Sequence, residues 1–386
     1  MGKEKRPNPT VLIILMLLAV RFLWIVACDS SEIKLPEKIT QAVEATREAY
    51  VPDSRHDRFE VEIHRYRGDY IVKGEVIHPE AGKALFAALK DAMPKTEFID
   101  SLIVLPVKDL GNRTYGIVRV GVVPMRRTAS VTAEQVSQTV LGTVVPLYKK
   151  ERGSYFVQNW DKYLGWVAGS RILPVDAERA AAWQKGPHVV CTANHGPVFE
   201  RPSASSDVLA VLVPGCVVKR VARQGGWIRV ELPDGQTGYI LREQVADETI
   251  LQDVRLDRND LAWASRRFLG VPYLWGGVSP NGFDCSGFVQ AVFRMNGIPL
   301  PRDASQQVKE GTAVDFSGGF DDLMPSDLLF FGPRPERITH VGLYLGQGRF
   351  IHSSGWVRIN SLVREGPLFH ESLLESLQAV RRIMTR

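Results

Sequence analysis

Apolar and polar residues alternate along residues 59–66 and again along residues 70–76, and a Gly-Asp pair lies between the two runs. This period of two with a turn in the middle predicts a β-hairpin. Residues 80–93 have apolar residues at helical spacing instead. Two more strand-like runs follow. We therefore expect a small α+β module over residues 57–124, preceded by a polar linker over residues 29–56.

Two later stretches, residues 126–175 and 187–247, repeat one pattern. Each is a string of short apolar runs separated by glycine turns, with a W-x-x-V or Y-F-V run followed by a G-W-V or G-Y-I run. Short strands that close on one another leave few exposed sheet edges. The aromatic runs resemble those of bacterial SH3-like barrels. We expect such barrels over residues 125–178 and 186–248.

The last 137 residues change pattern once more. Helical spacing predicts helices over residues 256–268 and 285–296, and three short apolar runs after them predict strands. Helices followed by strands are typical of an α+β domain. We expect this domain to span residues 250–386.

The first 28 residues combine a basic start with an apolar run. Three basic residues precede the run at residues 11–27, which only Arg21 interrupts. Cys28 follows Ile-Val-Ala, which resembles a bacterial lipobox, where the cysteine is acylated. Three interpretations stay open: a lipoprotein signal with lipidation at Cys28, an uncleaved membrane anchor, and a cytosolic amphipathic segment. The first two place the rest of the chain outside the cytoplasm.

Composition narrows the function classes. A chain of 386 residues is too long for one ordinary core, and 45% apolar with 24% charged residues is typical of a folded domain protein. The net charge of +5 is small, and the chain contains no long run of basic residues, so we expect no nucleic-acid partner. The four cysteines lack metal-ligand spacing. Cys191 and Cys216 fall in the second barrel, where two buried free thiols are favoured over a disulfide.

Cys285 has the setting of a nucleophile. Asp284 is a good N-cap residue, so Cys285 falls in the first turn of a predicted helix. The positive end of a helix favours a thiolate, and its free N–H groups can stabilise an oxyanion. His340 opens one predicted strand and His352 ends the next, so a hairpin brings both to one end of a sheet. His340 is then the base for Cys285, and His352 holds its ring.

Each of these three residues alone is more typical of a buried thiol or an ordinary histidine. Their order and their surrounding motifs, however, resemble the NlpC family of cell-wall cysteine peptidases. The resemblance implies a papain-like fold for the C-terminal domain, a triad of Cys285, His340 and His352, and no cofactor or metal. It also implies cleavage of peptidoglycan stem peptides, commonly between D-glutamate and a diamino acid. The motifs lie at residues 273–277, 283–289, 300–307, 327–331, 340–346 and 350–353.

Family members that carry SH3-like barrels act on freed stem peptides with an unblocked N-terminal L-alanine. Their pattern implies that Asp303, with Glu134 and Tyr163 from the first barrel, holds the substrate ammonium. A carboxylate suits that task because charge-assisted hydrogen bonds are strong. A solvated surface acid for Glu134 and a core aromatic for Tyr163 are equally good interpretations.

Three residues near the nucleophile complete the expected site. Asp284 and Ser286 flank Cys285 and are expected to line the pocket. Tyr273 is expected to assist the oxyanion or the thiol, unless it is only a packing aromatic. Two other functions stay open: a wall-binding protein whose catalytic domain is inactive, and an amidase or acyltransferase on the same fold.

Overall fold

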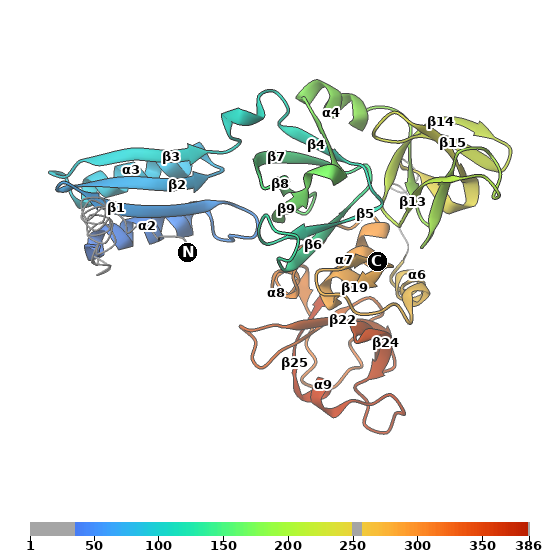
Figure 1. Ribbon diagram of the computed structural model, residues 1–386. Helices are drawn as coiled ribbons and strands as arrows, with labels where there is room; N and C mark the ends of the chain where they lie inside the picture. The colour runs from blue at the N-terminus through green and yellow to red at the C-terminus, as the bar shows by residue number, and fades with distance from the viewer. Residues whose placement is uncertain (1–34, 249–256, 385–386) are drawn as a thin grey trace, which may run out of the picture.

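The computed structural model describes residues 35–248 and 257–384, so the predicted signal or anchor segment with Cys28 lies outside the described residues. An N-terminal module, two β-rich units and a C-terminal domain follow one another along the chain (Figure 1). The predicted α+β class is confirmed. None of the helices in the described ranges combines the length and apolar character of a bilayer-spanning segment.

The N-terminal module contains two helices and one three-stranded sheet that share a core. Strand β2 pairs antiparallel with β1, as the predicted hairpin requires, and parallel with β3. Its elements are α2 (Glu37–Tyr50), β1 (Phe59–Tyr66), β2 (Asp69–Val76), α3 (Pro79–Ala92) and β3 (Phe98–Val104).

Two predicted boundaries of this module are wrong. Residues 29–56 are not simply a linker, because 14 of them form α2 and bury Ile39, Ala42 and Val43 against the sheet. These residues have helical spacing, which the many charged neighbours obscure. The module also does not reach residue 124, because β4 (Tyr115–Val118) pairs with strands of the next unit.

The first SH3-like unit is a seven-stranded sheet of order β10-β4-β7-β8-β9-β5-β6, with a core of alternating inward-facing side chains. It begins at β4 rather than at the predicted residue 125. The prediction missed this start because the alternation of apolar and polar residues shows that a strand forms but not which sheet it joins. Its other elements are β5 (Val122–Arg126), β6 (Gln135–Val140), β7 (Val144–Glu151), β8 (Ser154–Gln158), β9 (Leu164–Ala168) and β10 (Ile172–Val175), with short 3-10 turns before and within it and α4 (Ala177–Gln184) after it.

The second SH3-like unit is another seven-stranded sheet, of order β13-β12-β16-β15-β14-β11-β17. Cys191 and Cys216 lie in its core as buried free thiols, which confirms that prediction. Its strands are β11 (His188–Cys191), β12 (Gly196–Phe199), β13 (Val208–Leu212), β14 (Val217–Gln224), β15 (Trp227–Glu231), β16 (Thr237–Leu241) and β17 (Val245–Asp247).

The C-terminal domain packs α7 against the middle of a six-stranded sheet of order β20-β25-β21-β22-β23-β24. Its helices are α6 (Arg258–Ala264), α7 (Cys285–Met295), α8 (Ala304–Gln307) and α9 (Glu371–Glu375). Its strands are β18 (Val278–Ser279), β19 (Gly282–Phe283), β20 (Thr312–Ala313), β21 (Leu328–Phe331), β22 (His340–Gly346), β23 (Arg349–Ser354), β24 (Trp356–Ser361) and β25 (Leu377–Arg382).

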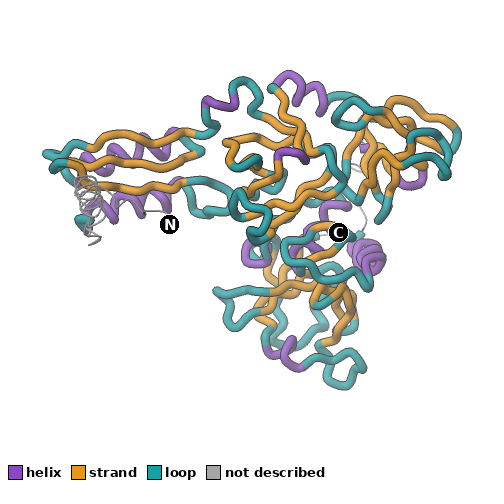
Figure 2. The backbone as a smooth tube through the Cα atoms, viewed as in Figure 1, coloured by secondary structure: helices purple, strands orange, loops and turns teal. Residues whose placement is uncertain are grey.

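Both SH3-like units lie against the C-terminal domain (Figures 1 and 2). Gln138 of β6 accepts hydrogen bonds at Oε1 from the Val278 backbone N–H at 2.9 Å and the Ser279 hydroxyl at 3.2 Å. Between the second SH3-like unit and the C-terminal domain, Arg267 donates to the Thr192 carbonyl at 2.6 Å. The first unit therefore fixes the loop that leads into α7.

Candidate active site

Helix α7 begins where the sequence predicts. Asp284 is its N-cap, and the Asp284 carboxylate accepts the Gly287 backbone N–H at 2.7 Å. Phe288, Val289 and Val292 bury the helix in the domain core. Cys285 is consequently the first helical residue and is held there by packing and by the cap.

The surroundings of the Cys285 thiol oppose the thiolate form that the helix N-terminus favours. Burial raises the pKa of Cys285 to about 12, and the charge of Asp284 raises it further. Backbone hydrogen bonds from Val341 and Ser286 act in the opposite direction but do not prevail. Val341 directly follows His340, so the sulfur lies beside the start of β22.

The two predicted histidines contact each other. His340 Nε2 lies 2.7 Å from His352 Nδ1. Burial lowers the pKa of His340 to about 3 and that of His352 to about 4. Both rings are therefore neutral at pH 7, and each carries one proton. The hairpin of β22 and β23 brings them together as predicted, although His352 lies within β23 rather than at its end.

A residue missing from the sequence-based site, Asn360 of β24, fixes the tautomers of both rings. His352 Nε2 lies 2.9 Å from the Asn360 carbonyl oxygen Oδ1, while the Asn360 amide donates to the Leu368 carbonyl at 3.1 Å. His352 thus donates from Nε2 and accepts at Nδ1 from His340 Nε2. Nδ1 of His340 is left with a free lone pair, as a general base requires.

Glycine at position 342 makes room for this pair. A Cβ atom there would lie 2.7 Å from the Phe350 ring and 3.3 Å from the Cβ of His352. Any larger residue would push β23, and with it His352, away from His340. The glycine of the His340-Val-Gly motif is therefore a packing requirement of the histidine pair.

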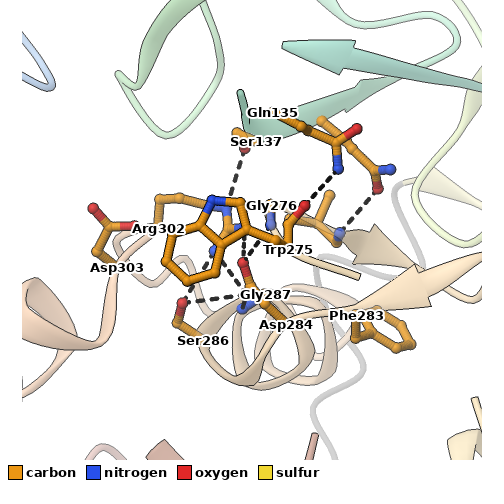
Figure 3. A network of polar contacts seen from close by, with 12 residues as sticks. Gln135, Ser137, Trp275, Gly276, Phe283, Asp284, Ser286, Gly287, Arg302 and Asp303 are labelled. Atoms are coloured by element: carbon orange, nitrogen blue, oxygen red, sulfur yellow. Dashed lines mark hydrogen bonds and ion pairs between the residues drawn. The ribbon is translucent and has the colours of Figure 1, made fainter. Parts of the chain in front are cut away.

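Asp284 and Ser286 do not line an open pocket as expected. Both are buried and face the side chain of Arg302, whose guanidinium donates to Asp284 at 2.5 and 3.0 Å and to the Ser286 hydroxyl at 3.0 Å. Asp284 also accepts the Gly276 backbone N–H at 2.9 Å. Figure 3 shows these residues converging at the start of α7. We call Asp284, Ser286 and Arg302 the Arg302 network.

The Arg302 network also reaches the first SH3-like unit, because Arg302 Nε donates to the Ser137 hydroxyl at 3.2 Å (Figure 3). A buried charged pair is tolerated when further hydrogen bonds support it, and here Asp284 also accepts two backbone N–H groups while Arg302 also donates to two serine hydroxyls. The network therefore supports the position of Cys285 and the docking of the neighbouring unit. Burial raises the pKa of Tyr273, and the negative charge of the Cys285 thiolate form, followed by that of Asp284, raises it further; Tyr273 therefore lies near the thiol, as predicted.

Asp303 and Tyr163 meet as the resemblance implies. The Tyr163 hydroxyl donates to Asp303 Oδ2 at 3.2 Å across the boundary between the first SH3-like unit and α8. Burial and the Asp303 charge raise the pKa of Tyr163, so the hydroxyl stays a donor. Glu134 pairs instead with Arg127, which donates to it at 2.6 Å, and this ion pair is within electrostatic reach of Tyr163 and Asp303, whose charges raise the pKa of Arg127. We call Asp303, Tyr163 and Glu134 the Asp303 cluster.

A separate cavity of about 430 Å³ lies behind α7, between the C-terminal domain and the SH3-like units. Its lining includes Trp160, Cys191 and Arg294 but neither Cys285 nor either histidine. The predicted triad therefore does not face this cavity.

Comparison with known proteins supports the same division of the chain. The NlpC/P60 family model matches residues 270–376, and the bacterial SH3 domain model matches residues 192–247. Dipeptidyl-peptidase 6 of Lysinibacillus sphaericus is 29% identical over 64% of this chain and 92% of its own length. Gamma-D-glutamyl-L-lysine dipeptidyl-peptidase of Bacillus subtilis is 38% identical over 36% of this chain and 44% of its own length, so the chain spans less than half of that relative.

A solved NlpC/P60 family protein from Bacillus cereus has the same fold, with a TM-score of 0.60, 22% identity, and coverage of 70% of this chain and 99% of that one. The fold and the relatives together define a cysteine-type hydrolase. Its C-terminal domain belongs to the NlpC/P60 family, and a bacterial SH3 domain precedes it.

Proposed function

We propose that this hydrolase is an extracytoplasmic cysteine endopeptidase that cleaves the bond between γ-D-glutamate and the diamino acid of peptidoglycan stem peptides with a free N-terminal L-alanine. The observation that carries the proposal is the chain of contacts from Asn360 through His352 to His340, beside the buried Cys285. The names of the relatives support a peptidase, and one of them names a γ-D-glutamyl bond.

The proposed reaction is acyl transfer through a thioester. As the Cys285 sulfur attacks the scissile carbonyl, its proton passes to Nδ1 of His340. Backbone N–H groups at the start of α7 hydrogen-bond the oxyanion, with Tyr273 close by. The C–N bond breaks, and the departing amine takes the proton from His340. A water molecule, deprotonated by His340, then hydrolyses the thioester and restores the thiol.

In the proposed substrate complex, the Asp303 cluster holds the ammonium of L-alanine. Asp303 supplies charge and Tyr163 supplies a hydroxyl whose raised pKa keeps it neutral. An ammonium on a carboxylate is a charge-assisted hydrogen bond, stronger than a neutral one. The requirement for a free amine would direct the enzyme to peptides already released from the glycan.

Matched tripeptides test the proposal. L-Ala-γ-D-Glu-diamino acid and its N-acetyl form are incubated with the protein, and products are identified by mass. We expect release of the diamino acid, with kcat/KM for the free peptide about tenfold or more above that for the acetylated one, since a charged hydrogen bond contributes about 1.5–3 kcal/mol. Equal rates would remove the ammonium role of the Asp303 cluster. Absence of cleavage of any wall peptide would favour a binding protein, and transfer of the acyl group to a second amine would indicate a transferase.

A further inference from the structure

The segment that joins α2 to β1 reaches into the Asp303 cluster. The Leu164 backbone N–H donates to the Arg55 carbonyl at 2.8 Å, and the Gln158 side chain donates to the His56 carbonyl at 2.7 Å. These bonds fix the segment on the first SH3-like unit. From the C-terminal domain, the Gln306 amide donates to Asp53 at 2.7 Å. The segment is therefore held from both sides of the boundary at which Tyr163 meets Asp303.

Arg55 places its guanidinium on the Asp303 carboxylate. Its Nη1 atom donates to Asp303 Oδ2 at 2.8 Å and to the Ser305 hydroxyl at 3.0 Å. Its Nε and Nη2 atoms donate to the two oxygens of Asp53 at 2.8 and 2.7 Å. One arginine thus joins two carboxylates. Burial alone would lower the pKa of Arg55, but the hydrogen bonds to the two carboxylates raise it by more. It is a permanent cation at this position.

The oxygen that Arg55 contacts is the one that Tyr163 also contacts. A carboxylate oxygen has two lone pairs, and both are engaged by these donors. A substrate ammonium directed to the same oxygen must therefore displace a donor. Of the two, Arg55 is the cation, and it keeps a two-point contact with Asp53 when it leaves Asp303.

Burial indicates that this displacement is possible. The Arg55 and Asp303 side chains are 32% and 28% exposed, and ion pairs that water reaches contribute little, roughly 0–1 kcal/mol. Glu134 has a similar arrangement, with Arg127 on one carboxylate oxygen and the Trp275 indole N–H on the other at 2.9 Å. Both acids expected to hold a substrate amine therefore already carry an arginine of this chain.

We propose that Arg55 is a specificity-determining residue that competes with the substrate ammonium for Asp303, and so weakens the selection of peptides with a free N-terminus. The inference rests on the proposed function of the Asp303 cluster. An enzyme with this resident cation binds free-amine peptides less tightly than the cluster alone would, and it discriminates less against N-acylated ones.

The test compares the wild type with Arg55→Gln on the free and N-acetyl tripeptides. Removal of the competing cation should lower KM for the free peptide by about two- to fivefold, with kcat within about twofold and the acetylated peptide unaffected. Arg58→Gln is the matched control, because Arg58 lies three residues away and pairs with Glu60 and Glu75 instead. Arg55→Lys keeps the charge but cannot join two carboxylates, so its KM should lie between those of the wild type and Arg55→Gln.

An unchanged or raised KM for the free peptide in Arg55→Gln, or an equal gain on both peptides, would overturn the proposal and leave Arg55 as a structural strap. Calorimetry separates this failure from failure of the proposed function. Binding of the free tripeptide is measured in a Cys285→Ala background, with and without Arg55→Gln. If the wild type cleaves neither peptide, or cleaves both equally, the proposed function fails. If the free tripeptide binds no more tightly to the Cys285→Ala/Arg55→Gln double variant than to Cys285→Ala, the role of Arg55 is overturned, whatever the kinetic result.

Discussion

Arg302 and Asp303 are neighbours in the chain, yet their side chains belong to two regions of opposite character (Figure 3). Arg302 joins the buried Arg302 network, where its side chain is 1% exposed and that of Asp284 is 9% exposed. Asp303 instead forms a half-exposed pair with Arg55, and the hydroxyl of the buried Tyr163 donates to it. Both regions pair an arginine with an aspartate, so the difference between them is access of water.

Water access decides what each pair can do. A buried pair cannot exchange partners without leaving a charge unsolvated, so the Arg302 network is suited to hold Cys285 in place. A half-exposed pair exchanges partners at low cost, so the Asp303 cluster is suited to meet a charged ligand. Substitutions in the first region should therefore affect stability and kcat, and those in the second should affect KM.

The largest effect is expected for Arg302→Ala. It leaves the Asp284 carboxylate buried without its counter-ion, and we expect a loss of about 3–5 kcal/mol in the free energy of unfolding of the C-terminal domain. Urea denaturation followed by fluorescence measures it. Arg349→Ala is the control, because Arg349 is exposed and contacts only Gln347 through its side chain among the described residues; it should change stability by less than about 0.5 kcal/mol. A loss below about 1 kcal/mol for Arg302→Ala would contradict the distinction between the two regions.

The pH profile of kcat/KM tests the buried histidines. A general base works only when unprotonated, and burial lowers the pKa of His340 to about 3. As pH falls from 7 to 5, His340 stays neutral and the rate should be retained; it should fall only as the pH approaches that pKa. Circular dichroism over the same range distinguishes this from acid unfolding. A decline centred near pH 6.5, the value of an exposed histidine, would show that the pair is not buried as described.

Asn360→Ala should have a smaller effect on the same region. It removes one hydrogen bond that fixes the His352 tautomer, and a loss of about 1–1.5 kcal/mol corresponds to a roughly five- to tenfold lower kcat. KM should stay within about twofold. Steady-state kinetics measure both. A rise in KM without loss of kcat would mean that Asn360 contacts substrate instead of orienting His352.

The smallest effect is expected in the half-exposed region. Ser305→Ala removes one acceptor of Arg55 while leaving the Asp303 carboxylate in place. Because the loss of this one partly exposed hydrogen bond weakens the hold on Arg55 by only about 0.5 kcal/mol, KM for the free-amine tripeptide should fall about twofold. The N-acetyl peptide serves as the internal control. A change in kcat instead of KM would contradict this prediction, because it would mean that Ser305 supports the Arg302 network and Cys285 instead of the Asp303 cluster.

Local patterns predicted the parts of the site that depend on local structure. An N-cap before Cys285 and a hairpin between His340 and His352 involve residues that are close in sequence, and turn and capping chemistry describe them well. The resemblance to a family added Asp303 and Tyr163, which no periodicity connects, and the structure brings these two together.

The residues that escaped prediction depend on how distant segments dock. Arg55 and Asp303 are 248 residues apart, and Arg302 and Ser137 are 165 apart. No spacing rule reaches that far. Helix α2 escaped for another reason: its buried residues are few and its charged ones many, so composition resembled a linker. Asp284 was expected to line the substrate pocket, but Arg302 engages both of its carboxylate oxygens, a contact that sequence spacing does not reveal.

Hydrolysis of the free L-Ala-γ-D-Glu-diamino acid tripeptide by Cys285→Ala tests the central claim most directly. The variant keeps the fold, because a buried thiol is replaced by a smaller apolar group and the Asp284 cap is untouched. We predict that kcat/KM falls by at least about 10³-fold relative to the wild type, as expected when a nucleophile is removed. A rate within tenfold of the wild type would show that another group attacks the substrate.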